Sequence, residues 1–269
     1  MTSLTLSGPQ TRTAPRTAPR KAPWAAFGQI VRNEARLASR RPLGLIGGIG
    51  LPVGLLIVFG ELPSFKQTLP QLGGHSLFSA YVPVLMCFGL GMLALLGLPI
   101  PLVSYRELGV LRRLSTTPVP PSWLLAAQGA VQLGTAVITG TAVVIISTTA
   151  FGVAAPKSPG GLVVSYLLAV AGLFAIGLVI ASLARTSGAV NVIGRVTFFP
   201  LMFFAGLWLP RALMPGFLVD VSNFTPLGAA VQAVQASMQT GFPPVEPLLV
   251  LAGYAVVFGF LAKRFFRWE

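Results

Sequence analysis

The stretch YRELGVLRRLSTTPVPPSW, residues 105–123, separates two long runs of residues that carry no charge. Only 9% of the 269-residue chain is charged, yet this stretch places Arg106, Glu107, Arg112 and Arg113 within eight positions. Soluble domains carry about 25% charged residues, so this chain has too few to solvate a protein surface. We therefore expect a membrane protein in which residues 105–123 form an exposed connection between two spans.

The apolar runs on both sides of this stretch predict six membrane-spanning helices. A span needs roughly 20 mostly apolar residues, and the mean hydropathy of the chain is +0.79. We predict spans over residues 43–60, 77–101, 123–151, 161–184, 192–210 and 245–262. The predicted fold class is therefore an all-α polytopic membrane protein.

The region before the first span divides into a tail and a helix. Residues 1–23 are polar and Pro-rich, which predicts a disordered basic tail outside the membrane domain of residues 24–269. Residues 24–41 place apolar side chains at helical spacing, namely Trp24, Phe27, Val31, Ala35 and Ala38. Another face of the same helix is basic, with Arg32, Arg36 and Arg40. This pattern is typical of an amphipathic helix that lies in the headgroup region.

Residues 211–244 are interrupted by prolines and do not form a seventh span. Within them, LGAAVQAVQASMQ (227–239) has an apolar side and a side with three glutamines. We predict a re-entrant or amphipathic helix at the outer leaflet, just before the last span.

The basic residues define the orientation of the predicted spans. With the N-terminus in the cytoplasm, 16 of the 19 Lys and Arg residues lie on the inner side, and the outer side holds Lys66, Lys157 and Arg211. Cytoplasmic connections carry an excess of Lys and Arg, so both termini and residues 105–123 are expected in the cytoplasm of a cell membrane. The net charge of +13 then fits contact with the bilayer and does not predict a nucleic-acid partner.

The predicted spans lack the groups that transport chemistry within one chain requires. Four of the six runs contain no Asp, Glu, Lys, Arg or His, namely 43–60, 77–101, 123–151 and 161–184, and the run 245–262 contains only Glu246, at its start. Proton-coupled carriers place ionisable side chains at membrane depth. A P-loop needs Gly-Lys followed by Ser or Thr, and none of the four lysines follows a glycine. Energy for uphill transport would therefore come from another subunit.

Catalysis by this chain is not predicted either. Its one histidine, His75, lies in the predicted outer loop 61–76, so a His-rich metal site cannot form within one chain. Ser76 and Ser79 are near it in sequence, but neither lies in a Gly-x-Ser-x-Gly turn. We predict no catalytic residues, no metal ligands and no cofactor bound by this chain.

The third predicted span carries one polar face. Gln128, Gln132, Thr135 and Thr139 recur at i, i+4, i+7 and i+11. In lipid such side chains must face another helix or a hydrated cavity. The face therefore has two interpretations that the sequence leaves open: packing against a neighbouring helix, or lining a translocation path.

The charged stretch itself predicts a cytoplasmic helix of about three turns over residues 105–115. Glu107 lies near its start and Arg112 and Arg113 near its end, as the helix dipole favours. Thr117-Pro118 ends the helix, and Pro120-Pro121 stiffens the return to the membrane. A short rigid helix between the second and third spans can transmit a push, which a flexible loop cannot.

The sequence RELGVLRRLSTTPV (106–119) closely resembles the signature of ABC-2 type permeases. That signature is an acidic residue, Gly, any residue, Leu, Arg, Arg-Leu and then Thr-Pro. The matching positions are Glu107, Gly109, Leu111, Arg112, Leu114, Thr117 and Pro118. GLWLPRALMPGFLVDVSNFTPL (206–227) is similar to the family's segment after the fifth span, with Met214 where Leu is commoner. The resemblance covers residues 24–269, including the six spans.

The resemblance, most of all to daunorubicin-resistance exporters, implies a permease that pairs with a second copy and with two separate ATPase subunits, which bind ATP and Mg. It implies that the cytoplasmic helix is the coupling element for the ATPase and that residues 24–41 are an additional contact. The residues implied in coupling are Arg106, Glu107, Gly109, Leu111, Arg112, Arg113, Leu114, Thr117 and Pro118. The implied substrate is a lipophilic small molecule that leaves the cell, and the alternative within the family is a lipid or lipid-linked glycan.

Three other classes remain as alternatives. A secondary or facilitative carrier would transport without an ATPase. An intramembrane enzyme would depend on His75. A scaffold that transports nothing would not need the polar face of residues 128–139.

Overall fold

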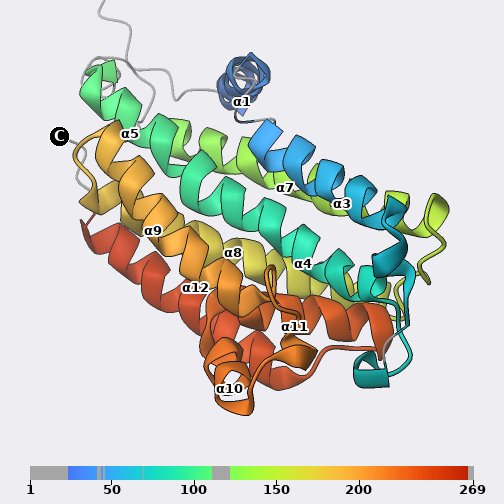
Figure 1. Ribbon diagram of the computed structural model, residues 1–269. Helices are drawn as coiled ribbons and strands as arrows, with labels where there is room; N and C mark the ends of the chain where they lie inside the picture. The colour runs from blue at the N-terminus through green and yellow to red at the C-terminus, as the bar shows by residue number, and fades with distance from the viewer. Residues whose placement is uncertain (1–23, 41–43, 45, 69, 111–121, 266–269) are drawn as a thin grey trace, which may run out of the picture.

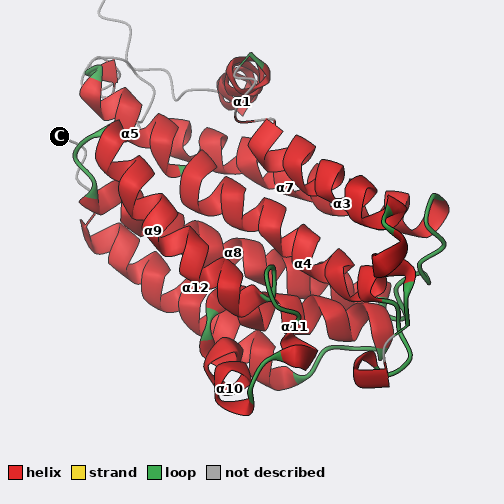
Figure 2. Cartoon of the chain, in the orientation of Figure 1, coloured by secondary structure: helices red, strands yellow, loops and turns green. Residues whose placement is uncertain are grey.

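The computed structural model of the protein describes residues 24–40, 44, 46–68, 70–110 and 122–265. These residues form helices joined by short loops (Figures 1 and 2). The α-helices are α1 (Trp24–Ser39), α3 (Leu51–Glu61), α4 (Leu77–Met92), α5 (Pro99–Glu107), α7 (Ser122–Thr149), α8 (Pro159–Leu183), α9 (Ser187–Ala205), α10 (Gly216–Phe224), α11 (Pro226–Gln239) and α12 (Val245–Phe265).

Five of the described helices are long and apolar enough to cross a membrane, and a shorter apolar helix covers Ile46–Glu61. The five are Leu77–Glu107, Ser122–Thr149, Pro159–Leu183, Ser187–Ala205 and Val245–Phe265. The prediction of an all-helical protein is confirmed. Figure 1 shows α1 nearly end-on while the long helices run across the view, so α1 lies across the bundle and not along it.

Hydroxyl side chains begin several of these helices. The Oγ atom of Ser158 accepts a hydrogen bond from the Gly161 amide at 3.1 Å, and Pro159 occupies the first turn of α8. Thr186 caps α9 in the same way, by accepting from the Ala189 amide at 3.1 Å. Such caps satisfy amides that have no partner inside the helix, which matters most where no water can replace them.

The helix in the region of the fifth predicted span has different bounds, which its local capping signals explain. Residues 192–210 were expected, whereas α9 runs from Ser187 to Ala205. It begins earlier because Thr186 is its cap, and it ends at Gly206, whose φ of 92° is left-handed and favours glycine. The third, fourth and sixth predicted spans agree within a few residues with α7, α8 and α12.

The helix that contains the second predicted span is longer than the span. The sequence predicts residues 77–101, but α4, the π-helical turn η4 (Leu93–Gly97) and α5 form one apolar helix from Leu77 to Glu107. The predicted separate helix over 105–115 is therefore wrong at its start, because residues 105–107 are the last turn of α5. Arg106 and Glu107 were assigned to a helix separate from the span, although the apolar helix continues through them to the turn at Leu108–Gly109.

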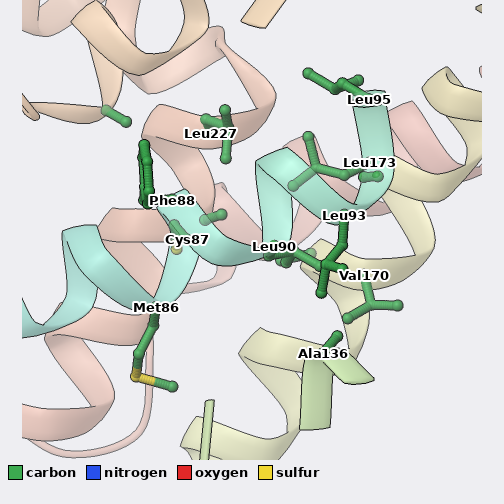
Figure 3. Close-up of a cluster of buried hydrophobic side chains, with 14 of the residues drawn as sticks. Met86, Cys87, Phe88, Leu90, Leu93, Leu95, Ala136, Val170, Leu173 and Leu227 are labelled. Carbon is green, nitrogen blue, oxygen red and sulfur yellow. The ribbon is translucent and has the colours of Figure 1, made fainter. Parts of the chain in front are cut away.

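The core of the bundle forms around α4. Leu85, Cys87 and Leu90 are fully buried and belong to one hydrophobic cluster with residues of α8 and α11. Figure 3 shows the side chains of Leu90 and Leu93 beside that of Val170, which lies on α8. Residues of this helix are thus covered by protein on most sides, whereas α7 and α12 expose many apolar side chains.

The π-helical turn η4 packs directly on two glycines. A Cβ atom at Gly177 of α8 would lie 2.1 Å from the carbonyl oxygen of Ala94, and one at Gly194 of α9 would lie 2.7 Å from that of Leu95. Only hydrogen at these positions allows such close approach of two backbones. The contacts hold α8 and α9 against the middle of the long Leu77–Glu107 helix.

The segment between α9 and α12 folds back into the bundle. The Ser222 hydroxyl donates to the carbonyl of Phe204 at 2.6 Å, and the Arg211 guanidinium donates to the Gly228 carbonyl at 3.0 Å and to the side chain of Asn223. Burial lowers the pKa of Arg211. α11 is packed against α4, α8, α9 and α12. The predicted helix over 227–239 therefore exists, and it is buried among other helices.

We predict that Gly177→Ala destabilises the protein although alanine is the better helix former. The new methyl group would meet the Ala94 carbonyl at 2.1 Å, so the free energy of unfolding should fall by about 1–3 kcal/mol. Thermal unfolding in detergent measures the effect. Gly253→Ala on α12 is the matched control, because nothing lies within 4 Å of its added Cβ. Equal melting temperatures for the two variants would contradict the close contact.

Candidate functional site

A cavity of about 470 Å³ lies where α1 crosses the bundle, and we call it the α1 cavity. One wall comes from α1 and the residues after it, a second from η4 and α5, and a third from α7. Its lining residues are Glu34, Leu37, Ala38, Arg40, Gly44, Leu93, Leu96, Gly97, Ile100, Pro101, Gln128, Gln132 and Thr135. Three segments that are distant in sequence therefore build one concave surface.

Glu34 is the buried charged residue of this cavity. It is only 5% exposed. Its carboxylate accepts hydrogen bonds from the Tyr105 hydroxyl at 2.8 and 3.0 Å and from the Gln128 amide at 2.7 Å. Burying a carboxylate costs several kcal/mol unless hydrogen bonds compensate. These bonds therefore fix α1 to the end of α5 and to α7.

The buried face of α1 differs from the predicted face. Val31 and Ala38 lie half-buried, as predicted, but Ala35 is exposed and Glu34 is the most buried described side chain of the helix. The Phe27 ring packs edge-on against Trp123 of α7, with centroids 5.6 Å apart. The helix is amphipathic with a carboxylate at the centre of its apolar face, and sequence reasoning missed that carboxylate.

The polar face of α7 divides between the two interpretations. Gln128, Gln132 and Thr135 line the α1 cavity. The Thr139 hydroxyl instead donates to the carbonyls of Gly48 and Thr135, both at 2.9 Å, and its side chain is fully buried. Thr139 is thus a packing contact with the turn before α3. Gln128 lines the cavity and also bonds to Glu34 of α1, and Gln132 and Thr135 line the cavity.

The end of α5 is attached to the turn between α8 and α9, and we call these contacts the α5 junction. The Arg106 guanidinium donates to the carbonyl of Ala181, in the last turn of α8, at 2.6 Å. The Glu107 carboxylate accepts from the backbone amide of Ser187 at 3.1 Å and from its hydroxyl. A cation at a helix C-terminus and an anion at a helix N-terminus both complement the helix dipole.

Glu107 therefore has a different electrostatic partner from the one the sequence predicts. It lies at the end of its own helix and at the start of α9, not at the start of a coupling helix. After it, Leu108 is 71% exposed and Gly109 has a φ of 66°, so the chain turns sharply there. The other predicted coupling residues lie outside the described residues: Leu111, Arg112, Arg113, Leu114, Thr117 and Pro118.

Residues 25–239 match the family described as ABC-2 type transporter. This match covers most of the chain, so the chain belongs to the ABC-2 type transporter family. It is a multi-pass membrane protein and a permease domain, which lacks ATPase activity of its own. Permeases of this family generally pair with an ABC ATPase. No curated protein matches the sequence.

The functional residues missed by sequence reasoning share one property. Glu34, Tyr105 and Ser187 form hydrogen bonds to residues 71 to 94 positions away. The available signal was Glu34 itself, because it lies four residues before Ala38 and seven after Phe27, within the apolar stripe of the helix. An acidic residue in such a stripe indicates a polar partner on the facing helix.

We predict that Tyr105→Phe loosens α1. The variant removes the hydroxyl that donates to Glu34 and keeps the ring, and hydrogen bonds to charged groups contribute about 1.5–3 kcal/mol. Amide exchange of α1 should therefore quicken about tenfold or more, since local opening follows the lost free energy. Tyr254→Phe is the control, because its hydroxyl donates to Phe224 and not to α1. Unchanged exchange in Tyr105→Phe would show that the Tyr105 hydroxyl does not hold α1 in place.

Proposed function

We propose that this chain is the permease of an ABC exporter that moves a lipophilic small molecule out of the cell. In this proposal six spans cross the cell membrane with both termini in the cytoplasm. Two permease copies work with two copies of a separate ATPase, which binds ATP and Mg. The excess of Lys and Arg in the connections on one side supports this orientation.

The observation that carries the proposal is the α5 junction. The end of α5 is bound through Arg106 to the end of α8 and through Glu107 to the start of α9. A force applied to the chain after Glu107 would therefore act on three helices at once. The exposed Leu108 supports a contact with another protein at this point. This is what coupling to an external ATPase requires.

A lipophilic cargo is supported by the α1 cavity. Its volume of about 470 Å³ falls within the range of small-molecule sites, roughly 300–1,000 Å³. Most of its lining is apolar, with a few polar groups on α7 and α1. A lipid or lipid-linked glycan remains the alternative cargo within the same family.

We predict that Glu107→Arg uncouples transport from ATP hydrolysis. The new cation would face the N-terminus of α9, where Ser187 now donates to the carboxylate, and like-signed charge there is unfavourable. With the partner ATPase present, export should fall about tenfold, in the range of coupling free energies between sites, while ATP hydrolysis persists. Transport into inverted vesicles and phosphate release measure the two quantities.

Glu61→Arg is the matched charge reversal for this experiment. Glu61 is exposed at the far end of α3, away from the α5 junction, so its export should equal that of the wild type. Normal export by Glu107→Arg would remove the α5 junction from the coupling mechanism.

We also predict that substitutions of Gln132 and Thr139, two polar residues on the same face of α7, have different effects. Gln132→Leu changes a cavity wall and should alter the relative rates for different cargo molecules while the melting temperature stays within a few degrees. Thr139→Val removes the hydrogen bond to Gly48 and should cost about 1 kcal/mol of stability with the cargo preference unchanged. Thr148→Val, at the far end of α7, is the control. A loss of stability in Gln132→Leu together with a changed cargo preference in Thr139→Val would contradict these separate roles.

A further inference from the structure

A groove of about 710 Å³ opens between α7 and α12, and we call it the α12 groove. Between these two helices it is lined by Leu98 and by Phe174 and Leu178 of α8. α12 packs along α8, whereas α7 packs mainly on α1 and α4. A space therefore remains over the surface of α8, and its lining is apolar except at Lys263.

Two glycines border this space. Gly129 of α7 and Gly259 of α12 both line the groove, and a Cβ atom added at either would have nothing within 4 Å. Gly177, by contrast, allows two helices to touch. Gly129 and Gly259 make no such contact among the described residues, so the volume beside them is open to a molecule from outside the chain.

The groove lies on the lipid-facing side of the bundle. α7 and α12 are the least buried of the five long apolar helices in the described part of the chain, and the Phe260 side chain beside Gly259 is 64% exposed. Lipid acyl chains are as apolar as these side chains, so a chain that enters the groove is held by close packing and not by the hydrophobic effect. Preference for one lipid over another must therefore come from the headgroup.

One end of the groove is basic. Lys263 lines it, and Arg264 follows in the same last turn of α12. Both side chains are exposed, and neither forms a hydrogen bond or ion pair with another residue that the structure describes. None of the lining residues is acidic. Long basic side chains at the end of a span extend to the membrane surface, where they attract anionic headgroups.

The basic end of the groove lies at headgroup level. Leu125, in the first turn of α7, lines the groove, and Trp123 belongs to the same turn. Tryptophan is enriched at the membrane interface. The Trp123 ring also packs on Phe27 of α1, an amphipathic helix of the kind that lies among headgroups. Lys263 and a lipid phosphate in the adjoining leaflet are therefore at similar depth.

We propose that the α12 groove binds an anionic phospholipid, with an acyl chain against Leu98, Phe174 and Leu178 and its phosphate at Lys263 and Arg264. The lipid fills the space between α7 and α12 and links the end of α12 to the first turn of α7. The groove shares no lining residue with the α1 cavity, and this inference does not depend on the proposed export.

The test compares two phospholipids with identical acyl chains. Dioleoylphosphatidylglycerol is anionic and dioleoylphosphatidylcholine is net neutral, and native mass spectrometry of the purified protein in detergent measures the Kd of the first bound lipid. Lys263→Gln should raise the Kd for the anionic lipid about fivefold and leave that for the neutral lipid within about twofold. Arg36→Gln, on the exposed face of α1, is the matched loss of one cation and should change neither Kd by more than about twofold.

A second pair of variants tests the groove itself. Gly129→Phe places a ring in the open volume and should raise the Kd for both lipids about tenfold. Gly134→Phe is the matched control, because Gly134 lies on the same helix, is exposed and has nothing within 4 Å of an added Cβ, but does not line the groove. Unchanged lipid binding in Gly129→Phe, or equal effects of Lys263→Gln on the two lipids, would overturn the proposal.

A second copy of this chain is the other occupant that such a groove could have. Light scattering in the same detergent measures the molar mass, and Gly129→Phe should leave it unchanged. A shift of this variant toward the monomer with both Kd values unchanged would assign the groove to the second copy and overturn the proposal. Glycerol 1-phosphate should not displace the anionic lipid, because it lacks acyl chains. Its displacement of the lipid would show that the groove contributes nothing, which also contradicts the proposal.

Discussion

The hydrogen bonds of the Glu34 carboxylate are the interaction on which the arrangement at this end of the bundle depends. They join α1, the end of α5 and the first half of α7. An amphipathic helix whose apolar face lies in the lipid can take any position along the membrane surface. A buried carboxylate with partners on two other helices removes that freedom, because leaving it unsatisfied in an apolar environment is costly. The position of α1, and with it one wall of the cavity, follows from this one residue.

The long Leu77–Glu107 helix carries both the core and the two candidate sites. Its middle is fixed by the contacts of η4 with Gly177 and Gly194, and its end is fixed by the α5 junction. Between these points, Ile100 and Pro101 form part of the cavity wall. The same helix thus lies in the core, borders the cavity and ends at Glu107, where the chain leaves the helix.

Hydrophobic runs predict the existence and most of the bounds of the long helices, since length and apolar content are local properties of the sequence. Errors occur where charge was taken as the end of a helix, as at Tyr105–Glu107, and where a cap lies upstream of the apolar run, as at Thr186. The polar face of α7 was visible from its spacing, but only the fold separates Thr139 from Gln132. Glu34 could not be assigned a role, because its partners are 71 and 94 positions away.

The geometry of α5 links the two sites mechanically. About 9 Å of helix separates Ile100 at the cavity from Arg106 at the junction, and two turns of α-helix move as one body. The π-helical turn η4 lies just before this piece, and such turns are points where a helix bends. A displacement at the α5 junction would therefore be carried to Ile100 and Pro101 in the cavity wall. The bond from Tyr105 to Glu34 would carry it to α1 as well, so the cavity changes shape relative to its wall on α7.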